Sequence, residues 1–141
     1  MITKLPACTS GSLTLWSEVL RHVNMTLISE AQWKYRYTQG AIWNNALYCN
    51  RSMACVLYPG IKPVLPDGTQ VSGGANGSLI VEHSAQNSSM DHVQFMLEVQ
   101  WTDGSVDYYI FEVNFTVVCK CYQYRLLYLK CLLKYFLAVG Q

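Results

Sequence analysis

Two long stretches of alternating side chains, His92–Trp101 and Val106–Val118, flank the short segment TDGS. In the first stretch, apolar residues occupy every second position from Val93 to Trp101, with mostly polar residues between them. In the second stretch, the same alternation runs from Tyr109 to Val117. A period of two on β-branched and aromatic residues predicts two strands, each with one buried face.

The pairing of these two strands depends on the length of the turn between them. A two-residue loop at Asp103-Gly104 would set the apolar face of one strand against the polar face of the other, which the period of two forbids. A three-residue loop, with Gly104 left-handed in a bulge, brings apolar residues together. We therefore predict a bulged hairpin that pairs Leu97 with Tyr109, Phe95 with Phe111 and Val93 with Val113.

Shorter strand-like segments precede the hairpin. They cover residues 12–16, 23–28, 31–38, 41–49, 53–58 and 78–82, and a loop rich in Pro and Gly, with an edge strand near 69–71, fills residues 59–77. Many short strands with turns about every ten residues favour an all-β sandwich. We expect an irregular lead-in at 1–11, one β-sandwich domain at 12–118, and a separate tail at 119–141.

The tail is rich in Leu and compatible with a helix. Its charges, Lys120, Arg125, Lys130 and Lys134, leave no uncharged run near the roughly 18–20 residues that a membrane span needs. We expect a basic, apolar helix that lies at a membrane surface or packs on the sandwich, or a remnant without a role of its own. Residues 1–16 hold no apolar segment of the kind found in a signal peptide.

Composition narrows the classes of partner. The formal net charge is +1, so no basic surface argues for nucleic acid. The chain has ten Tyr and four Trp, which suit both a sandwich core and a recognition surface. Four of these are hard to place inward, and an exposed patch of them would be a protein-binding anchor: Trp43, Tyr48, Tyr58 and Tyr108.

Five of the seven Asn residues begin an N-glycosylation sequon: Asn24, Asn50, Asn76, Asn87 and Asn114. Chance predicts about one sequon from seven Asn at this content of Ser and Thr. This density indicates a glycosylated chain of the secretory pathway, extracellular or membrane-associated. Asn114 falls on the polar face of its predicted strand.

The six cysteines also favour an oxidising compartment. Cys49 and Cys55 are close enough in sequence to form a disulfide across the turn between them, which would stabilise the fold by roughly 2–3 kcal/mol. Cys8 could pair with Cys119 or Cys121. Cys131 also remains, and a cysteine left without a partner in the chain could form a disulfide with a second chain. Cys119-Lys-Cys121 lacks the spacing of a zinc site, so we expect no metal.

No catalytic pattern accompanies the histidines. His22, His83 and His92 occur without a Ser or Cys nucleophile motif, and we expect them at the surface. Gly73-Gly74 is not followed by the Lys-Ser/Thr of a phosphate-binding loop. We therefore expect neither enzymatic activity nor a cofactor.

The order of motifs resembles an immunoglobulin variable-type domain. Trp33 would be the core Trp of its third strand, Ser78–Glu82 a later strand, and the hairpin the last two strands. The chain departs from the family because Leu97 stands in the place of one disulfide Cys, Phe95 stands in the place of the corner Tyr, and residues 22–30 hold no Cys. The resemblance therefore implies a core held by packing around Trp33, Phe95, Leu97 and Phe111.

The Trp33-Lys-Tyr segment, the LYCNRS segment at 47–52, Cys55 and the sequon at Asn76 are similar to immunoglobulin-like domains of DNA-virus immune-evasion glycoproteins. These are the CR1 domains of adenovirus E3 proteins and the RL11-family domains of cytomegaloviruses. The resemblance implies a viral glycoprotein that binds a host immune-receptor or adhesion ectodomain. An alternative is a structural envelope or assembly glycoprotein that pairs with itself, as a dimer, or with another viral chain.

Overall fold

The computed structural model describes residues 2–8, 11–15, 25–37, 40–66, 68–83 and 92–117.

The hairpin has the predicted register. Strands β8 (His92–Trp101) and β9 (Val106–Val117) pair Val93 with Val113, Phe95 with Phe111 and Leu97 with Tyr109. The turn is the expected bulge, because Gly104 has φ +90° and its N–H donates to the carbonyl of Trp101 at 3.0 Å.

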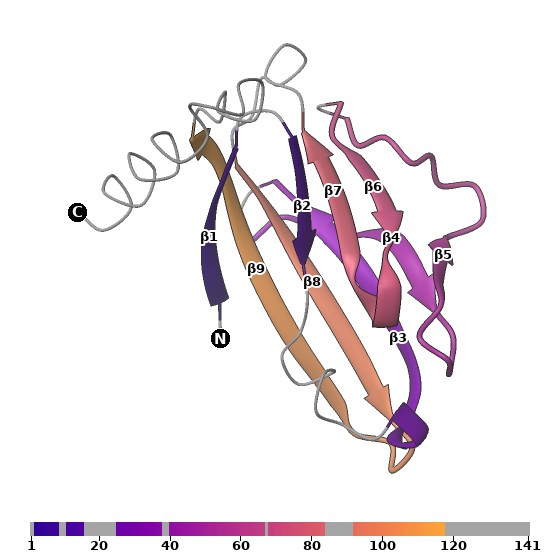
Figure 1. Cartoon of the computed structure of the whole chain (residues 1–141). Helices are drawn as coiled ribbons and strands as arrows, with labels where there is room; N and C mark the ends of the chain where they lie inside the picture. Colours follow the sequence, from indigo (N-terminus) through magenta and orange to yellow (C-terminus); the bar gives the residue numbers. More distant parts are fainter. Residues whose placement is uncertain are drawn as a thin grey trace, which may run out of the picture.

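Two sheets form around this hairpin (Figure 1). The six-stranded sheet has the order β1-β9-β8-β3-β4-β5, and the three-stranded sheet has the order β2-β7-β6. The remaining strands are β1 (Ile2–Cys8), β2 (Gly11–Leu15), β3 (Ile28–Arg36), β4 (Asn44–Cys49), β5 (Cys55–Leu57), β6 (Gln70–Gly73) and β7 (Leu79–His83). Two single-turn 3₁₀ helices, η1 (Met25–Leu27) and η2 (Ala75–Gly77), precede β3 and β7.

This strand order is that of a variable-type immunoglobulin sandwich. The last two strands and β3 form the centre of one sheet, β4 and β5 extend that sheet, and β2, β7 and β6 form the other. Alternation predicted an all-β sandwich and the resemblance of the motifs implied an immunoglobulin-like domain, and the structure confirms both. The tail at 119–141 lies outside the described residues.

The prediction of an irregular lead-in at 1–11 is wrong. Residues Ile2–Cys8 form β1, which pairs in parallel with β9, and Gly11 already belongs to β2. A parallel partner more than a hundred residues away leaves no local signal, and Pro6 argued against a strand. Pro6 is tolerated because β1 lies at the edge of its sheet.

The prediction of a strand at 23–28 is also wrong for residues 25–27, the described residues of that range that precede β3. Met25–Leu27 form the 3₁₀ helix η1, the Leu27 side chain is 52% exposed rather than inward, and β3 begins at Ile28. In the second sheet β7 pairs with β6 on one side and with β2 on the other, and β2 lies close to the strand predicted at 12–16. Its alternating Leu13 and Leu15 are half-buried and buried.

The core lies between the sheets and draws on both. Trp33, Phe95 and Leu97 have no measurable exposure, and Phe111 is 8% exposed. They pack with Leu15, Val71, Leu79 and Val81 of the second sheet. The indole Nε1 of Trp33 donates to the carbonyl oxygen of Gly77 at 2.8 Å, and so ties the six-stranded sheet to the turn before β7.

The two sheets also touch along one edge. At Gly73 of β6, a Cβ atom would lie 2.5 Å from the carbonyl oxygen of Cys55 in β5. Only a residue without a side chain permits this close approach of two backbones.

Candidate protein-binding face

The outer face is defined here as the surface of the six-stranded sheet that points away from the second sheet. Because side chains alternate along a strand, the neighbours of the core residues all lie on this face. Its described members include Ile2, Lys4, Pro6, Glu30, Gln32, Lys34, Arg36, Asn45, Tyr48, Val56, His92, Gln94, Met96, Glu98, Gln100, Val106, Tyr108, Ile110, Glu112 and Asn114.

Strand register arranges these side chains in rows across the sheet. One row runs from β5 to β9 and is formed by Val56, Tyr48, Gln32, Glu98 and Tyr108. The next row runs from β3 to β1 and is formed by Lys34, Met96, Ile110 and Ile2. A third row is formed by Arg36, Gln94, Glu112 and Lys4.

A polar network fixes the middle of the face. Gln32 Nε2 donates to Glu98 Oε2 at 2.8 Å, and Lys34 Nζ lies 3.2 Å from the same oxygen. The hydroxyl of Tyr58 donates to Gln32 Oε1. These bonds hold side chains of β3, β8 and the segment after β5 in one arrangement, so the polar groups in this part of the face have fixed positions.

A second network crosses the next strands. Arg36 Nε donates to Gln94 Oε1 at 2.7 Å, and Gln94 Nε2 donates to Glu112 Oε1 at 3.0 Å. His92 Nε2 lies 3.0 Å from Glu112 Oε1, and Lys4 Nζ lies 3.9 Å from Glu112 Oε2. The hydrogen bonds from Gln94 and His92 hold the pKa of the Glu112 carboxyl below its usual value.

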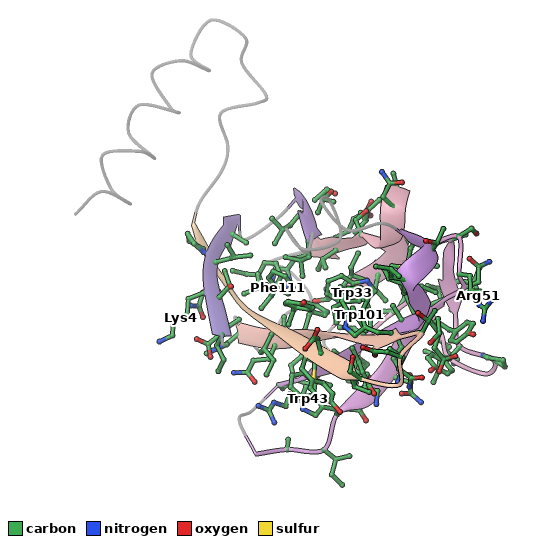
Figure 2. The ribbon with its side chains drawn as sticks, turned by 90° about the horizontal axis from the view of Figure 1, so that it is seen from below. Lys4, Trp33, Trp43, Arg51, Trp101 and Phe111 are labelled. Atoms are coloured by element: carbon green, nitrogen blue, oxygen red, sulfur yellow. A yellow bond between two sulfur atoms is a disulfide. The ribbon has the colours of Figure 1, made fainter. Side chains whose placement is uncertain are left out.

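The four aromatic residues expected to be hard to bury lie on or against the outer face. Figure 2 shows Trp43 on the side of the six-stranded sheet opposite Trp33 and Phe111, where the guanidinium of Arg36 lies 4.1 Å from the centroid of its ring. The rings of Tyr48 and Tyr58 pack edge to face with their centroids 6.0 Å apart. Tyr108 is 55% exposed. The face thus presents aromatic surface within a polar frame, which is typical of protein-binding surfaces.

Tyr48 carries a further contact at the edge of this face. Its hydroxyl donates to Glu30 Oε2 at 3.0 Å, and this hydrogen bond raises the pKa of the Tyr48 phenol. Burial raises the pKa of Tyr58. Both phenols are therefore neutral hydrogen-bonding groups at physiological pH.

Three predicted glycosylation sites fall within the described residues. Asn50 and Asn76 are exposed in turns, and Asn76 adopts the left-handed region with φ 54°. Asn114 is half-buried on the outer face, beside His92 and Pro6. Asn24 and Asn87 lie outside the described residues, and glycosylation of all five sites stays a prediction.

The predicted disulfide is confirmed. Cys49 and Cys55 are bonded, and they are direct partners in the ladder of β4 and β5. The turn between them is held by Asn50, whose Oδ1 accepts hydrogen bonds from the N–H groups of Ser52 and Ala54. The side chains of Cys8, Cys119, Cys121 and Cys131 lie outside the described part of the chain, so their predicted pairings remain untested.

The expected surface position of the histidines holds only in part. His92 is half-exposed, but His83 is 5% exposed and stacks on Phe115 with ring centroids 3.8 Å apart. Its Nδ1 lies 3.0 Å from Thr69 Oγ1, which is also buried. The prediction of a surface position was wrong for His83 because His83 is the last residue of β7 and lies on the same inward side of that strand as Leu79 and Val81. His22 lies outside the described residues.

A cluster of metal ligands and a membrane-spanning helix are both absent from the part of the chain that the structure describes. No group of three or more His, Cys, Asp or Glu side chains could hold a metal ion there. Among the same residues, no helix is long and apolar enough to cross a bilayer.

Comparisons with known proteins cover both sequence and structure. No protein-family model matches the sequence, and a search of curated proteins finds no match. Among solved structures, a chain titled "Marsupial T cell receptor" is 19% identical with a TM-score of 0.40, over 82% of this chain and 50% of that one. This protein therefore spans about half the length of that chain, and its immunoglobulin-like fold is established by its own strand order.

Proposed function

We propose that the chain is a recognition domain without catalytic activity, part of a viral immunomodulatory glycoprotein that binds a host immune-receptor or adhesion ectodomain. It would act in the secretory pathway, outside the cell or at the host membrane, by masking or sequestering its partner. The tail at 119–141 would add a membrane contact.

The observation that carries this proposal is the outer face. A surface built for contact with another protein exposes aromatic side chains and holds its polar groups in fixed positions. Tyr108 and Val56, 55% and 63% exposed, end a row whose middle is fixed by the Gln32–Glu98–Lys34 network. The sequons, the Cys49–Cys55 disulfide and the resemblance to viral immune-evasion glycoproteins support the compartment and the class of partner.

The first test asks whether the chain matures as a glycoprotein. The full chain is expressed in mammalian cells behind an added secretion leader, and its mobility is compared before and after N-glycosidase treatment. We expect secretion of the chain into the medium and a decrease in its apparent mass, after N-glycosidase treatment, that corresponds to several glycans. An unshifted, retained chain would remove the compartment on which the proposal depends.

The second test addresses the face. The secreted chain is screened against a panel of host immune-receptor and adhesion ectodomains by biolayer interferometry. For any captured ectodomain, Tyr108→Ala and Trp43→Ala should weaken binding by about tenfold or more, as expected for aromatic anchors of an interface. Ile61→Ala, which removes an apolar side chain that is 37% exposed in the loop after β5, is the matched control and should change little.

A further inference from the structure

Among the described residues, two charges on the outer face have no opposite charge beside them. Within the described residues, Glu30 contacts only the neutral hydroxyl of Tyr48, and Arg36 contacts the amide of Gln94, the carbonyl of Ala41 and the ring of Trp43. The other charged side chains of the face, Lys34 with Glu98 and the group around Glu112, are paired within the chain.

These two unpaired charges lie on the same strand and the same face. Both belong to β3, where Glu30 is near its start and Arg36 is its last residue. At the ordinary rise of about 3.3 Å per residue they lie roughly 20 Å apart. One end of the strand therefore presents an uncompensated negative charge and the other end an uncompensated positive charge.

Such a face is complementary to itself under one symmetry operation. A two-fold axis that lies in the interface and crosses the strands places the start of β3 in one copy against its end in the other. If the axis passes midway between Glu30 and Arg36, each carboxylate meets the guanidinium of the other copy. An axis parallel to the strands would instead set like charges together.

The same axis also matches two residues of β9, the exposed Tyr108 and the half-buried Ile110. The midpoint of Glu30 and Arg36 falls between the row of Gln32 and the row of Lys34, and on β9 these rows end at Tyr108 and Ile110. The axis therefore brings Tyr108 of one copy against Ile110 of the other. Ile2, which is 40% exposed and pairs with Ile110 in the ladder, borders this contact.

We infer that the outer face binds a second copy of this chain, with the strands of the two copies antiparallel, Glu30 against Arg36 and Tyr108 against Ile110. The inference rests on the proposed function only in its choice of face. A host ectodomain that binds this face would compete with the second copy.

The test measures self-association of the secreted, full-length glycoprotein by sedimentation over a dilution series from near-millimolar to micromolar concentration. We expect a reversible dimer that weakens as salt is added, because complementary charges contribute. Tyr108→Arg should abolish it. Val64→Arg, at a site that is 46% exposed in the loop after β5, should leave it intact.

Charge reversal then tests the geometry. Arg36→Glu makes both ends of β3 negative, and Glu30→Arg makes both ends positive, so each variant alone should lose the dimer by roughly ten- to a hundredfold in Kd. Mixed together, the two variants should form a heterodimer, because both contacts are then opposite in charge. This rescue also shows that each variant is folded.

A chain that stays monomeric at the highest concentration overturns the inference, and so does a dimer that survives Tyr108→Arg or fails to recover in the mixture. The proposed function fails separately. A monomer that still captures a host ectodomain overturns only the self-pairing, whereas a dimer that captures none overturns only the host-binding proposal.

Discussion

At the residue scale, one side chain replaces much of what a disulfide does in related folds. Leu97 stands where the variable-type pattern has a cysteine, so no covalent bond joins the sheets at this point. Trp33 lies beside it in the ladder, contacts Phe111 at a centroid distance of 5.8 Å and donates its indole N–H across the core to Gly77. The sheets are thus joined by packing and one buried hydrogen bond.

This role predicts the effect of Trp33→Phe. The substitution leaves the buried Gly77 carbonyl without its donor, which costs about 1–3 kcal/mol, and the smaller ring adds a packing loss. Urea unfolding followed by circular dichroism measures the change. The matched control is Trp101→Phe, since Trp101 Nε1 bonds the Asp107 carboxylate at an exposed position and its loss should cost less than about 1 kcal/mol. Equal losses at the two sites would contradict this account.

Glu112 predicts a dependence of stability on pH. Its hydrogen bonds keep the folded pKa below the usual value of 4.5, so its contribution is complete above pH 4.5 and is lost as pH falls through the folded pKa. The free energy of unfolding of the wild type should therefore decline below about pH 4.5 more steeply than that of Glu112→Gln. Urea titrations between pH 3 and pH 7 make the comparison, and parallel curves would exclude the carboxylate as a cause.

At the element scale, the short edge strand β5 has few ladder hydrogen bonds and depends on contacts outside the ladder for its position. It has three residues, and beyond its ladder with β4 it touches β6 through the close approach at Gly73. The Cys49–Cys55 disulfide fixes the hairpin of β4 and β5, and with it the positions of Tyr48 and Val56 on the outer face.

Removing the disulfide should therefore destabilise the fold measurably. For the double variant Cys49→Ala/Cys55→Ala we expect a loss of about 2–3 kcal/mol, the value for closing a loop of this length. Chemical denaturation under non-reducing conditions gives the difference from wild type. A change below about 0.5 kcal/mol would mean that the hairpin is held by its ladder and the Asn50 turn alone.

At the scale of the whole molecule, the sandwich separates two surfaces. One face of the six-stranded sheet is covered by the second sheet, while the other carries the charged and aromatic rows, in which Gln94 and Met96 are buried and Val56 and Tyr108 are exposed. Asn50 and Asn76 lie in turns, outside those rows. Glycans at these two sites would therefore leave the outer face accessible to a protein, whereas a glycan at Asn114 would stand on that face.

We expect both turn sites to be occupied when the chain passes through the secretory pathway. Asn50→Gln and Asn76→Gln should each remove one glycan, seen as one step of mobility on a denaturing gel, and the double variant should remove two. Asn44→Gln and Asn45→Gln alter asparagines outside any sequon and should change nothing. Wild-type mobility in the Asn50 and Asn76 variants would show that these sites are unused.

The sequence by itself determined the features that depend on neighbours along the chain. Alternation required one face of each hairpin strand to be buried, and the need to match apolar faces selected the bulged turn at Gly104 and its register. The short spacing of Cys49 and Cys55 made their bond predictable. The surplus of Tyr and Trp beyond inward positions pointed to Trp43, Tyr48, Tyr58 and Tyr108, all of which lie on or against the outer face.

Only the tertiary structure decided features that depend on contacts distant in sequence. β1 exists because the edge of β9 offers it a parallel partner, although Pro6 argued against a strand. The stacking of His83 on Phe115 joins residues from the two sheets, and the hydrogen bond from Trp33 to Gly77 joins one sheet to the turn before β7. The pairing of charges on the outer face likewise follows from strand order. A one-dimensional pattern shows which way a side chain points, but which strands become neighbours is set by packing of the whole core, and that order decides which charges stay unpaired.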